Sequence, residues 1–329
     1  MRRTLRLLLR RLAGTVPLLL IVAIGGFLLL EAAPGDAVDA YVGAIGGVDS
    51  VRAAELRAEW GLDRGPLQRF LAYGAALVRG DLGWSTAFQR PVLDVILERL
   101  PNTLILMGLA TALAFGVGSF LGIVAGARPG SRRDRALSIA SLAIYAMPGF
   151  WLGLVLIVIF AVDLRWLPTG GIETIASGKT GIDRLLDIAR HLILPVASLG
   201  IVYLALYLRL MRDSMAEVWK LDFVRAARAR GLPQRRLILR HVARNALLPV
   251  VTMLGLQFGA MLGGGIVVEG VFAIPGVGRL ALEAVVQRDM PLLLGVMLIS
   301  AVTVIAVNLV TDLAYTMLDP RVGSSESPA

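Results

Sequence analysis

The sequence predicts an all-α, polytopic membrane protein with six transmembrane helices and with both termini in the cytoplasm. The chain is 57% hydrophobic and only 17% charged, whereas a soluble domain carries about 25% charged residues. Six apolar runs are long enough, or nearly so, to cross about 30 Å of hydrocarbon. These runs are residues 12–30, 102–127, 136–162, 192–208, 247–269 and 292–315.

The distribution of basic residues predicts the orientation. The apolar runs separate seven polar segments, and the first, third, fifth and seventh of these together hold 20 of the 33 Lys and Arg in 71 residues. The other three hold 13 in 122 residues. Because cytoplasmic segments carry the basic excess, the first set is placed inside. The net charge of +9 is therefore a topology signal, and no nucleic-acid partner is expected. The inside segments are 1–11, 128–135, 209–246 and 316–329; the outside segments are 31–101, 163–191 and 270–291.

The first apolar run follows five arginines within residues 1–11, as in a secretory signal peptide. Its 19 residues exceed the usual 7–15-residue signal core. We therefore expect residues 12–30 to be retained as the first transmembrane helix.

The large outer segment, 31–101, mixes charged and apolar residues at helical spacing between Val51 and Gly80. This pattern predicts short amphipathic helices that lie against the membrane helices. Two interpretations remain open for their outer surface: a docking surface for another protein, or solvated packing.

Glycines recur at four-residue spacing in the second and fifth runs. Small residues on one helical face allow close approach of neighbouring helices in lipid. Helix packing within the chain is the expected role, and a contact with a second subunit is the alternative. The glycines are Gly118, Gly122 and Gly126, and Gly255, Gly259 and Gly263.

The third run contains Met147, Pro148 and Gly149 in its middle. Proline removes one hydrogen bond of the helix, and the glycine beside it loosens the backbone. The sequence predicts a kink here, either purely structural or lining a conduit.

Two acidic residues lie in or near the apolar runs. Asp312 is close to the inner end of the sixth run, where a carboxylate is costly unless paired. We expect a structural ion pair with Arg209 or Arg212 rather than a proton relay. Glu269, at the outer edge of the fifth run, is expected to reach the membrane interface.

The polar segment 213–246 is expected to form a helix, a stop and a second helix. Alanines at 226, 227 and 229 favour the first helix, Gly231 suits its end, and Pro233 suits the start of the next. A helix-turn-helix DNA reader has similar elements. It is disfavoured here because membrane-length apolar runs flank the segment and no soluble core surrounds it.

This segment resembles the cytoplasmic coupling loop of ABC-importer membrane subunits. Arg225-Ala226-Ala227, three residues and Gly231 fit the family pattern, with Arg in place of Glu. Leu248-Pro249 comes five residues later than in the general form. Both departures match the peptide/nickel subfamily. Four further landmarks also resemble that subfamily: residues 31–36, 60–64, 145–151 and 312–321.

The resemblance implies a type I, MetI-like permease core over residues 102–315, in the plasma (inner) membrane of a bacterium. It implies a homologous second permease, two cytoplasmic ABC ATPases or one fused pair, an extracytoplasmic binding protein and membrane lipid as partners. Peptides are the expected cargo, with nickel or another small solute as the alternative. An autonomous secondary transporter is the rival class. The residues that the resemblance assigns to ATPase coupling are Asp222, Arg225, Ala226, Ala227, Arg228 and Gly231.

Catalysis and metal binding are not expected in this chain. It has no cysteine, and the topology places His191 and His241 on opposite sides of the membrane. Gly178-Lys179-Thr180 lacks the glycine that a phosphate-binding loop needs five residues earlier, where Glu173 stands. We therefore expect no enzyme activity and no cofactor in this chain, with ATP and magnesium bound by the partner ATPases.

Overall fold

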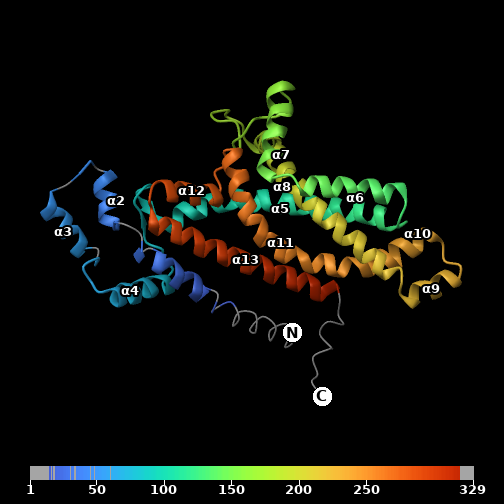
Figure 1. The fold of residues 1–329 in the computed structure, drawn as a ribbon. Coiled ribbons are helices and arrows are strands. Elements are labelled where there is room, and N and C mark those ends of the chain that lie inside the picture. The colour runs from blue at the N-terminus through green and yellow to red at the C-terminus, as the bar shows by residue number, and fades with distance from the viewer. Residues whose placement is uncertain are drawn as a thin grey trace, which may run out of the picture. The chain divides into compact units, whose positions relative to one another are not determined.

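The computed structural model describes residues 15, 17, 19–29, 31–32, 35–44, 46–47, 49–59 and 61–318, without the side chains of 37, 40, 44 and 312–318. Backbone contacts divide the chain into two compact units. Unit 1 comprises Met1–Asn102 and Pro275–Ile305, and unit 2 comprises Thr103–Ile274 and Ala306–Ala329. Nearly all of the regular structure in Figure 1 is helical.

Unit 1 carries the short elements of the chain. A two-residue antiparallel pairing, Trp84 opposite Pro91, precedes a long helix. Its core is an apolar cluster that includes Val92, Ile96 and Leu280. The elements confined to this unit are α2 (Ala37–Ala44), α3 (Ser50–Glu59), α4 (Pro66–Val78), β1 (Trp84–Ser85), β2 (Arg90–Pro91) and α12 (Val277–Val286).

A buried carboxylate organises the hairpin of unit 1. Asp289 is fully buried, and its Oδ2 accepts hydrogen bonds from Ser85 Oγ at 2.5 Å and Ala87 N at 3.0 Å. Its Oδ1 accepts from Leu292 N at 3.1 Å, in the first turn of α13 (Met290–Leu318). This residue therefore joins the hairpin to a helix start, where a carboxylate is favourable.

Unit 2 is built around one long helix, α8 (Gly181–Val218), which packs against α6, α7 and α11. Leu199, Tyr207 and Met211 are buried on it. The helix α5 (Val92–Gly126) enters this unit after Asn102. The remaining elements are α6 (Arg132–Tyr145), α7 (Gly149–Leu156), η1 (Ile157–Asp163), α9 (Asp222–Ala229), α10 (Gln234–Arg236), η2 (Leu237–Val242) and α11 (Ala243–Val271).

Glycines of α5 allow it to approach α8 closely. A Cβ added at Gly122 would lie 2.6 Å from Met211 Cβ and 2.7 Å from the Leu208 carbonyl oxygen. Gly118 and Gly126 are equally close to α8. The first glycine stripe thus serves helix packing within the chain, as predicted. In the second stripe Gly255 lies against Asn308, whereas Gly263 has open space around it.

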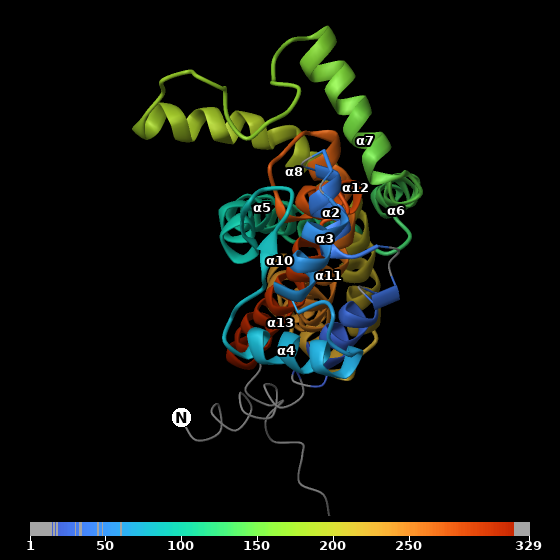
Figure 2. The same cartoon turned by 90° about the vertical axis from the view of Figure 1, so that its left-hand side faces the viewer.

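The predicted third span is broken rather than kinked. The helix α6 ends at Tyr145, Pro148 precedes the first residue of α7, and the two helical parts are bent by 97°. Figure 2 shows α6 nearly end-on with α7 rising from it. The interruption predicted at Met147, Pro148 and Gly149 is therefore present, and it is a break of the helix rather than a kink within a continuous one. Pro148 cannot donate to the preceding turn and disfavours helical backbone at Met147, so the helix stops and restarts.

The described residues contain four helices long and apolar enough to cross a membrane, or five if α6 and α7–η1 count as one span. The first predicted run, 12–30, is described only in part, and its continuous described part, Leu19–Leu29, is a shorter apolar helix. The long helices also extend beyond the apolar runs. For example, α8 begins at Gly181 rather than 192, and the helix expected from 247 already begins at Gln234.

Glu269 is not exposed at the surface of the chain, as a residue that reaches the membrane interface would be. It is fully buried on α11, and its Oε1 accepts a hydrogen bond from Thr103 Oγ1 at 2.6 Å. The expectation from its position near the end of an apolar run is therefore wrong, because helix packing encloses this carboxylate. A buried carboxylate needs such partners to offset the loss of hydration.

Candidate functional site

The helix α9 forms and ends as the sequence predicts. It begins at Asp222, whose carboxylate in the first turn suits the positive end of a helix. At its other end Gly231 has φ +76°. The Gly231 amide donates to the Arg228 carbonyl at 2.9 Å, and the Leu232 amide donates to the Ala227 carbonyl at 3.4 Å. This pair of bonds is a Schellman cap, which requires the left-handed backbone that glycine accepts most easily.

The two faces of α9 differ. Val224 and Ala227 are each 1% exposed and belong to an apolar cluster with residues of α8 and α11. Asp222, Arg225 and Ala226 are exposed on the opposite face.

The resemblance assigns Ala226, Ala227 and Gly231 alike to ATPase coupling, but the structure places Ala227 apart from the other two. Ala227 packs on its own chain, because residues 224 and 227 share one side of a helix. Ala226 and Gly231 remain accessible.

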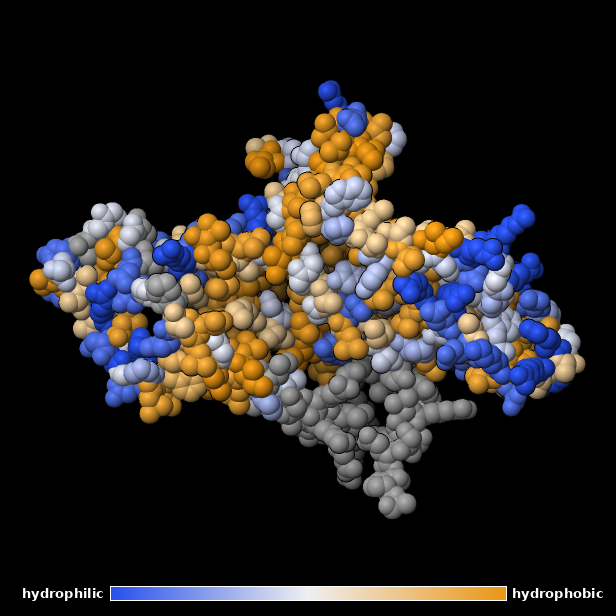
Figure 3. Space-filling view, viewed as in Figure 1, coloured by the Kyte–Doolittle hydropathy of each residue, from blue (hydrophilic) through white to orange (hydrophobic). Residues whose placement is uncertain are grey.

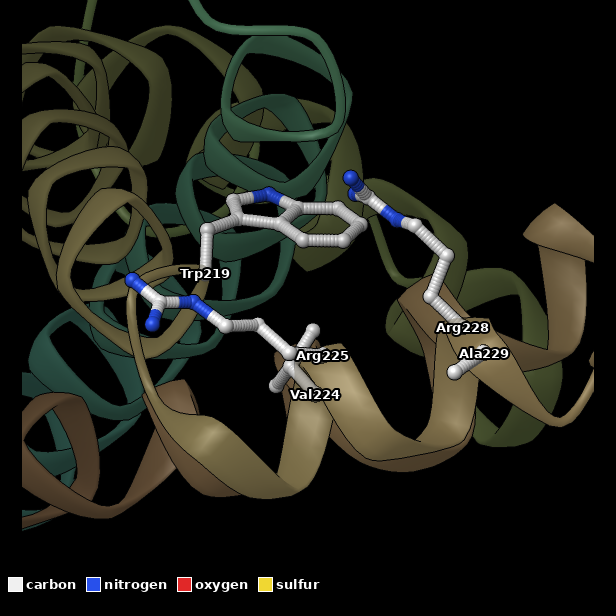
Figure 4. Close-up of a pocket in the computed structure, with 5 residues that line it drawn as sticks. All are labelled: Trp219, Val224, Arg225, Arg228 and Ala229. Atoms are coloured by element: carbon white, nitrogen blue, oxygen red, sulfur yellow. The ribbon is translucent and has the colours of Figure 1, made fainter.

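An open hollow of about 290 Å³ lies beside α9. Its floor is Trp219 at the end of α8, and Figure 4 shows the indole between the side chains of Arg225 and Arg228. The Arg228 guanidinium carbon is 5.3 Å from the centre of the indole ring, a distance suited to cation–π attraction. Arg225 pairs with Asp222 at 3.3 Å, and both side chains are largely exposed. The other lining residues are Val224 and Ala229.

Arginines give this end of unit 2 a strong positive charge. Figure 3 shows hydrophilic residues gathered over α9 and α10. Such a surface attracts acidic partners and anionic lipid headgroups over about 8 Å at physiological salt. The exposed arginines of segment 225–244 are Arg225, Arg228, Arg230, Arg235, Arg236, Arg240 and Arg244.

Sequence reasoning missed the partner of Arg212. Its Nε and Nη2 donate to the two carboxylate oxygens of Asp134, at 2.9 Å and 3.0 Å. Arg212 was instead one of two candidate partners for Asp312, and the other, Arg209, is exposed on α8. The side chain of Asp312 lies outside the described residues, so its pairing with Arg209 stays a prediction. The sequence feature that could have indicated this ion pair is Asp134, the one acidic residue within the arginine-rich segment 128–135.

The break between α6 and α7 forms a second candidate site. The Ser198 hydroxyl of α8 donates to the Gly149 carbonyl at 3.1 Å and so holds the start of α7. Three aromatic side chains beside the break are about half exposed: Tyr145, Phe150 and Trp151. Met147 is half-buried and Pro148 is exposed. The break thus presents backbone and aromatic groups at the surface of this chain.

These features define a multi-pass helical membrane protein in which two short arginine-rich helices, α9 and α10, lie between two long apolar helices. The chain belongs to the family of binding-protein-dependent transport system inner membrane components, whose model matches residues 118–324. The N-terminal model of the same systems matches residues 4–107. The protein is therefore a permease subunit of the ABC-importer family that includes peptide permeases, and it resides in the bacterial inner membrane.

Relatives of similar length support this assignment. The oligopeptide transport system permease protein AppB of Bacillus subtilis is 37% identical over 317 residues, covering 96% of this chain and 98% of the relative. The di/tripeptide transport system permease protein DppB of Pseudomonas aeruginosa is 37% identical, covering 95% and 97%. A putative peptide permease protein of Brucella ovis is 39% identical, covering 97% and 99%.

The fold also resembles that of a solved transporter. An inward-facing structure of the MetNI methionine ABC transporter aligns with a TM-score of 0.56 at 14% identity, covering 68% of this chain and 96% of the other. The permease core is thus MetI-like in fold. Membership of the importer family implies ATPase and permease partner subunits for this chain.

Proposed function

We propose that this chain forms half of the translocation pathway of an ATP-driven importer that takes up di- or oligopeptides from an extracytoplasmic binding protein. The observation that carries the proposal is α9, a capped helix with an exposed, charged outer face that packs through Val224 and Ala227 onto its own chain. The named functions of the relatives support peptides as cargo.

In this proposal α9 is the lever between ATP hydrolysis and transport. Closure of the two ATPases would push on the outer face formed by Asp222, Arg225 and Ala226, with Arg228 and Gly231 at its edge and end. Ala227 would take part by packing α9 onto the membrane helices. A rigid, buried inner face is needed because a displacement is transmitted only through groups that cannot yield.

The finer topology is part of the same proposal. Six transmembrane helices would place both termini in the cytoplasm, with residues 31–101 outside and 316–329 as an inner tail. A homologous permease would complete the pathway, and Met147, Pro148 and Gly149 would line it. ATP and magnesium would bind to the ATPases, and this chain would carry no cofactor. Asp312 would pair with Arg209 near the inner surface.

Two alternatives to this proposal differ from it in the cargo or in the partner subunits. The same machinery could import nickel or another small solute, in which case peptides would fail to stimulate ATP hydrolysis. An autonomous secondary transporter would need no ATPase. The importer is favoured over it because α9 has an exposed face suited to a cytoplasmic partner.

The test is purification of the tagged chain from native membranes, followed by measurement of ATPase activity in the purified material. We expect a second permease and ATP-hydrolysing subunits to co-purify, and a peptide-loaded binding protein to stimulate hydrolysis. A chain that purifies alone and still moves solute into liposomes would overturn the importer proposal. Stimulation by a nickel-loaded but not a peptide-loaded binding protein would overturn the peptide cargo alone.

A further inference from the structure

A line of contacts continues from α9 to the end of α5. Trp219, the residue that follows α8, lies beside Arg228 of α9 at 5.3 Å. Its indole Nε1 donates a hydrogen bond to the carbonyl of Gly126, the last residue of α5, at 2.8 Å. Figure 4 shows Trp219 beside Arg228. One side chain therefore contacts both the proposed lever and a second long helix, α5.

The ends of α5 and α8 are also in direct contact. A Cβ added at Gly126 would lie 2.8 Å from Met215 Cβ and 3.3 Å from the Arg212 carbonyl oxygen. Real Cβ atoms essentially never lie within 3.0 Å of another heavy atom, so the contact with Met215 shows that the two helices meet with no free space between them. Such close packing transmits a displacement because neither helix can move toward the other.

An ion pair joins α6 to the same place. The side chain of Asp134, in the first turn of α6, is 3% exposed and accepts hydrogen bonds from Nε and Nη2 of Arg212. The Gly130 amide donates to the same carboxylate at 2.8 Å, and the Ser131 hydroxyl caps the Asp134 amide at 3.2 Å. A bidentate, charge-assisted pair fixes orientation as well as distance. The turn between α5 and α6 is thereby closed onto α8.

We propose that Asp134, Arg212 and Trp219 are positioning residues that clamp the α5–α6 turn to the junction of α8 and α9. This inference rests on the proposed role of α9 as the coupling helix. Only Trp219, Lys220 and Leu221 join α8 to α9 along the chain. Without the clamp, a push on α9 would bend this short connection. With the clamp, α5, α6 and α8 move with α9 as one body.

The first test compares variants in the complete transporter, reconstituted in liposomes with its ATPases. Asp134→Asn and Trp219→Phe remove one clamp contact each, and the second keeps an aromatic ring. Asp213→Asn is the matched control, because Asp213 also binds Arg212, at 2.8 Å, but lies exposed on the same helix.

We expect the two clamp variants to lower the amount of cargo moved per ATP hydrolysed about fivefold or more, the lower range of coupling between distant sites. The Asp213→Asn transporter should match the wild type. Basal ATP hydrolysis should persist in every variant, since no clamp residue belongs to an ATPase.

The second test measures rigidity directly. The chain has no cysteine, so spin labels can be placed at Arg128→Cys in the turn and Arg230→Cys after α9. We expect the distance between the labels to be the same with and without ATP in the otherwise wild-type chain. In Asp134→Asn or Trp219→Phe that distance should change on ATP binding.

The outcomes separate the clamp from the function on which it rests. The clamp is overturned if the variants move as much cargo per ATP as a normally functioning wild type and also keep a constant distance between the labels. A wild-type chain that binds no ATPase overturns the coupling proposal itself. If Asp134→Asn fails to assemble, Trp219→Phe decides alone, because it deletes only the N–H donor and part of the ring.

Discussion

At the scale of single residues, glycines of this chain do two different things. Gly122 has no side chain because α8 occupies the space where one would lie, and an added Cβ would come within 2.7 Å of the Leu208 carbonyl oxygen. Gly231 has open space around it, and its role is the backbone conformation at φ +76°. Gly122 therefore allows close packing of two helices, whereas Gly231 allows the left-handed backbone that ends α9.

Replacing Gly122 by alanine tests the packing role. The added methyl group must push α5 and α8 apart, so we expect a loss of about 1–3 kcal/mol, as for other overpacked sites. Thermal unfolding of the purified chain in detergent measures this loss. Gly116→Ala on the same helix is the control, since a Cβ there meets nothing within 4 Å. Equal unfolding temperatures for both variants would contradict the close packing.

Replacing Gly231 by tryptophan tests docking at the end of α9. A Cβ added there meets nothing within 4 Å, so we expect normal membrane insertion but loss of transport in an uptake assay. Gly231→Asn controls for backbone strain, because asparagine tolerates positive φ. Uptake that is unchanged in Gly231→Trp would contradict a close partner at this position.

At the scale of elements, two prolines within apolar helices have opposite consequences. The helix α5 continues through Pro101, whereas α6 ends before Pro148 and α7 restarts after it. The difference lies in the surroundings: Ser198 binds the Gly149 carbonyl, and Gly153 of α7 fits against Phe272. Tertiary contacts therefore stabilise the break, and proline alone does not specify it.

Replacing Pro148 by alanine should weaken the break and lower the transport rate, because a helix can then extend through Met147. Transport per inserted molecule is the measurement. Pro101→Ala is the matched control and should leave transport unchanged, since that helix is already continuous. Full transport by Pro148→Ala would indicate that the contacts of α7 alone maintain the bend.

At the scale of the whole molecule, the distribution of charge predicts a sidedness that labelling can test. Ile175 is 93% exposed in the predicted outer loop, and Arg235 is exposed in the predicted inner segment. In this cysteine-free chain, we expect Ile175→Cys to react with a membrane-impermeant maleimide added to intact cells. Arg235→Cys should react only after the membrane is opened. The reverse pattern would invert the proposed topology.

Features that depend on neighbouring residues could be predicted from the amino-acid sequence. The apolar runs, the end of α9 at Gly231 and the restart after Pro233 follow from hydrophobicity and backbone preference within a few residues. The membrane class and the location of the coupling segment follow from these local signals. Helix ends that lie beyond the apolar runs, such as both ends of α8, were less predictable, because polar residues continue a helix once its other face is packed.

Contacts between distant residues became visible only in the packed chain. Arg212 binds Asp134, 78 positions away, Glu269 is enclosed beside Thr103, and Ala227 turns inward on α9. Such pairings depend on which helices pack together and on how each helix is rotated about its axis. A few neighbouring residues in the sequence specify neither of these. The physical reason is that hydrophobic burial is nondirectional, so it places a helix in the membrane without selecting its neighbours.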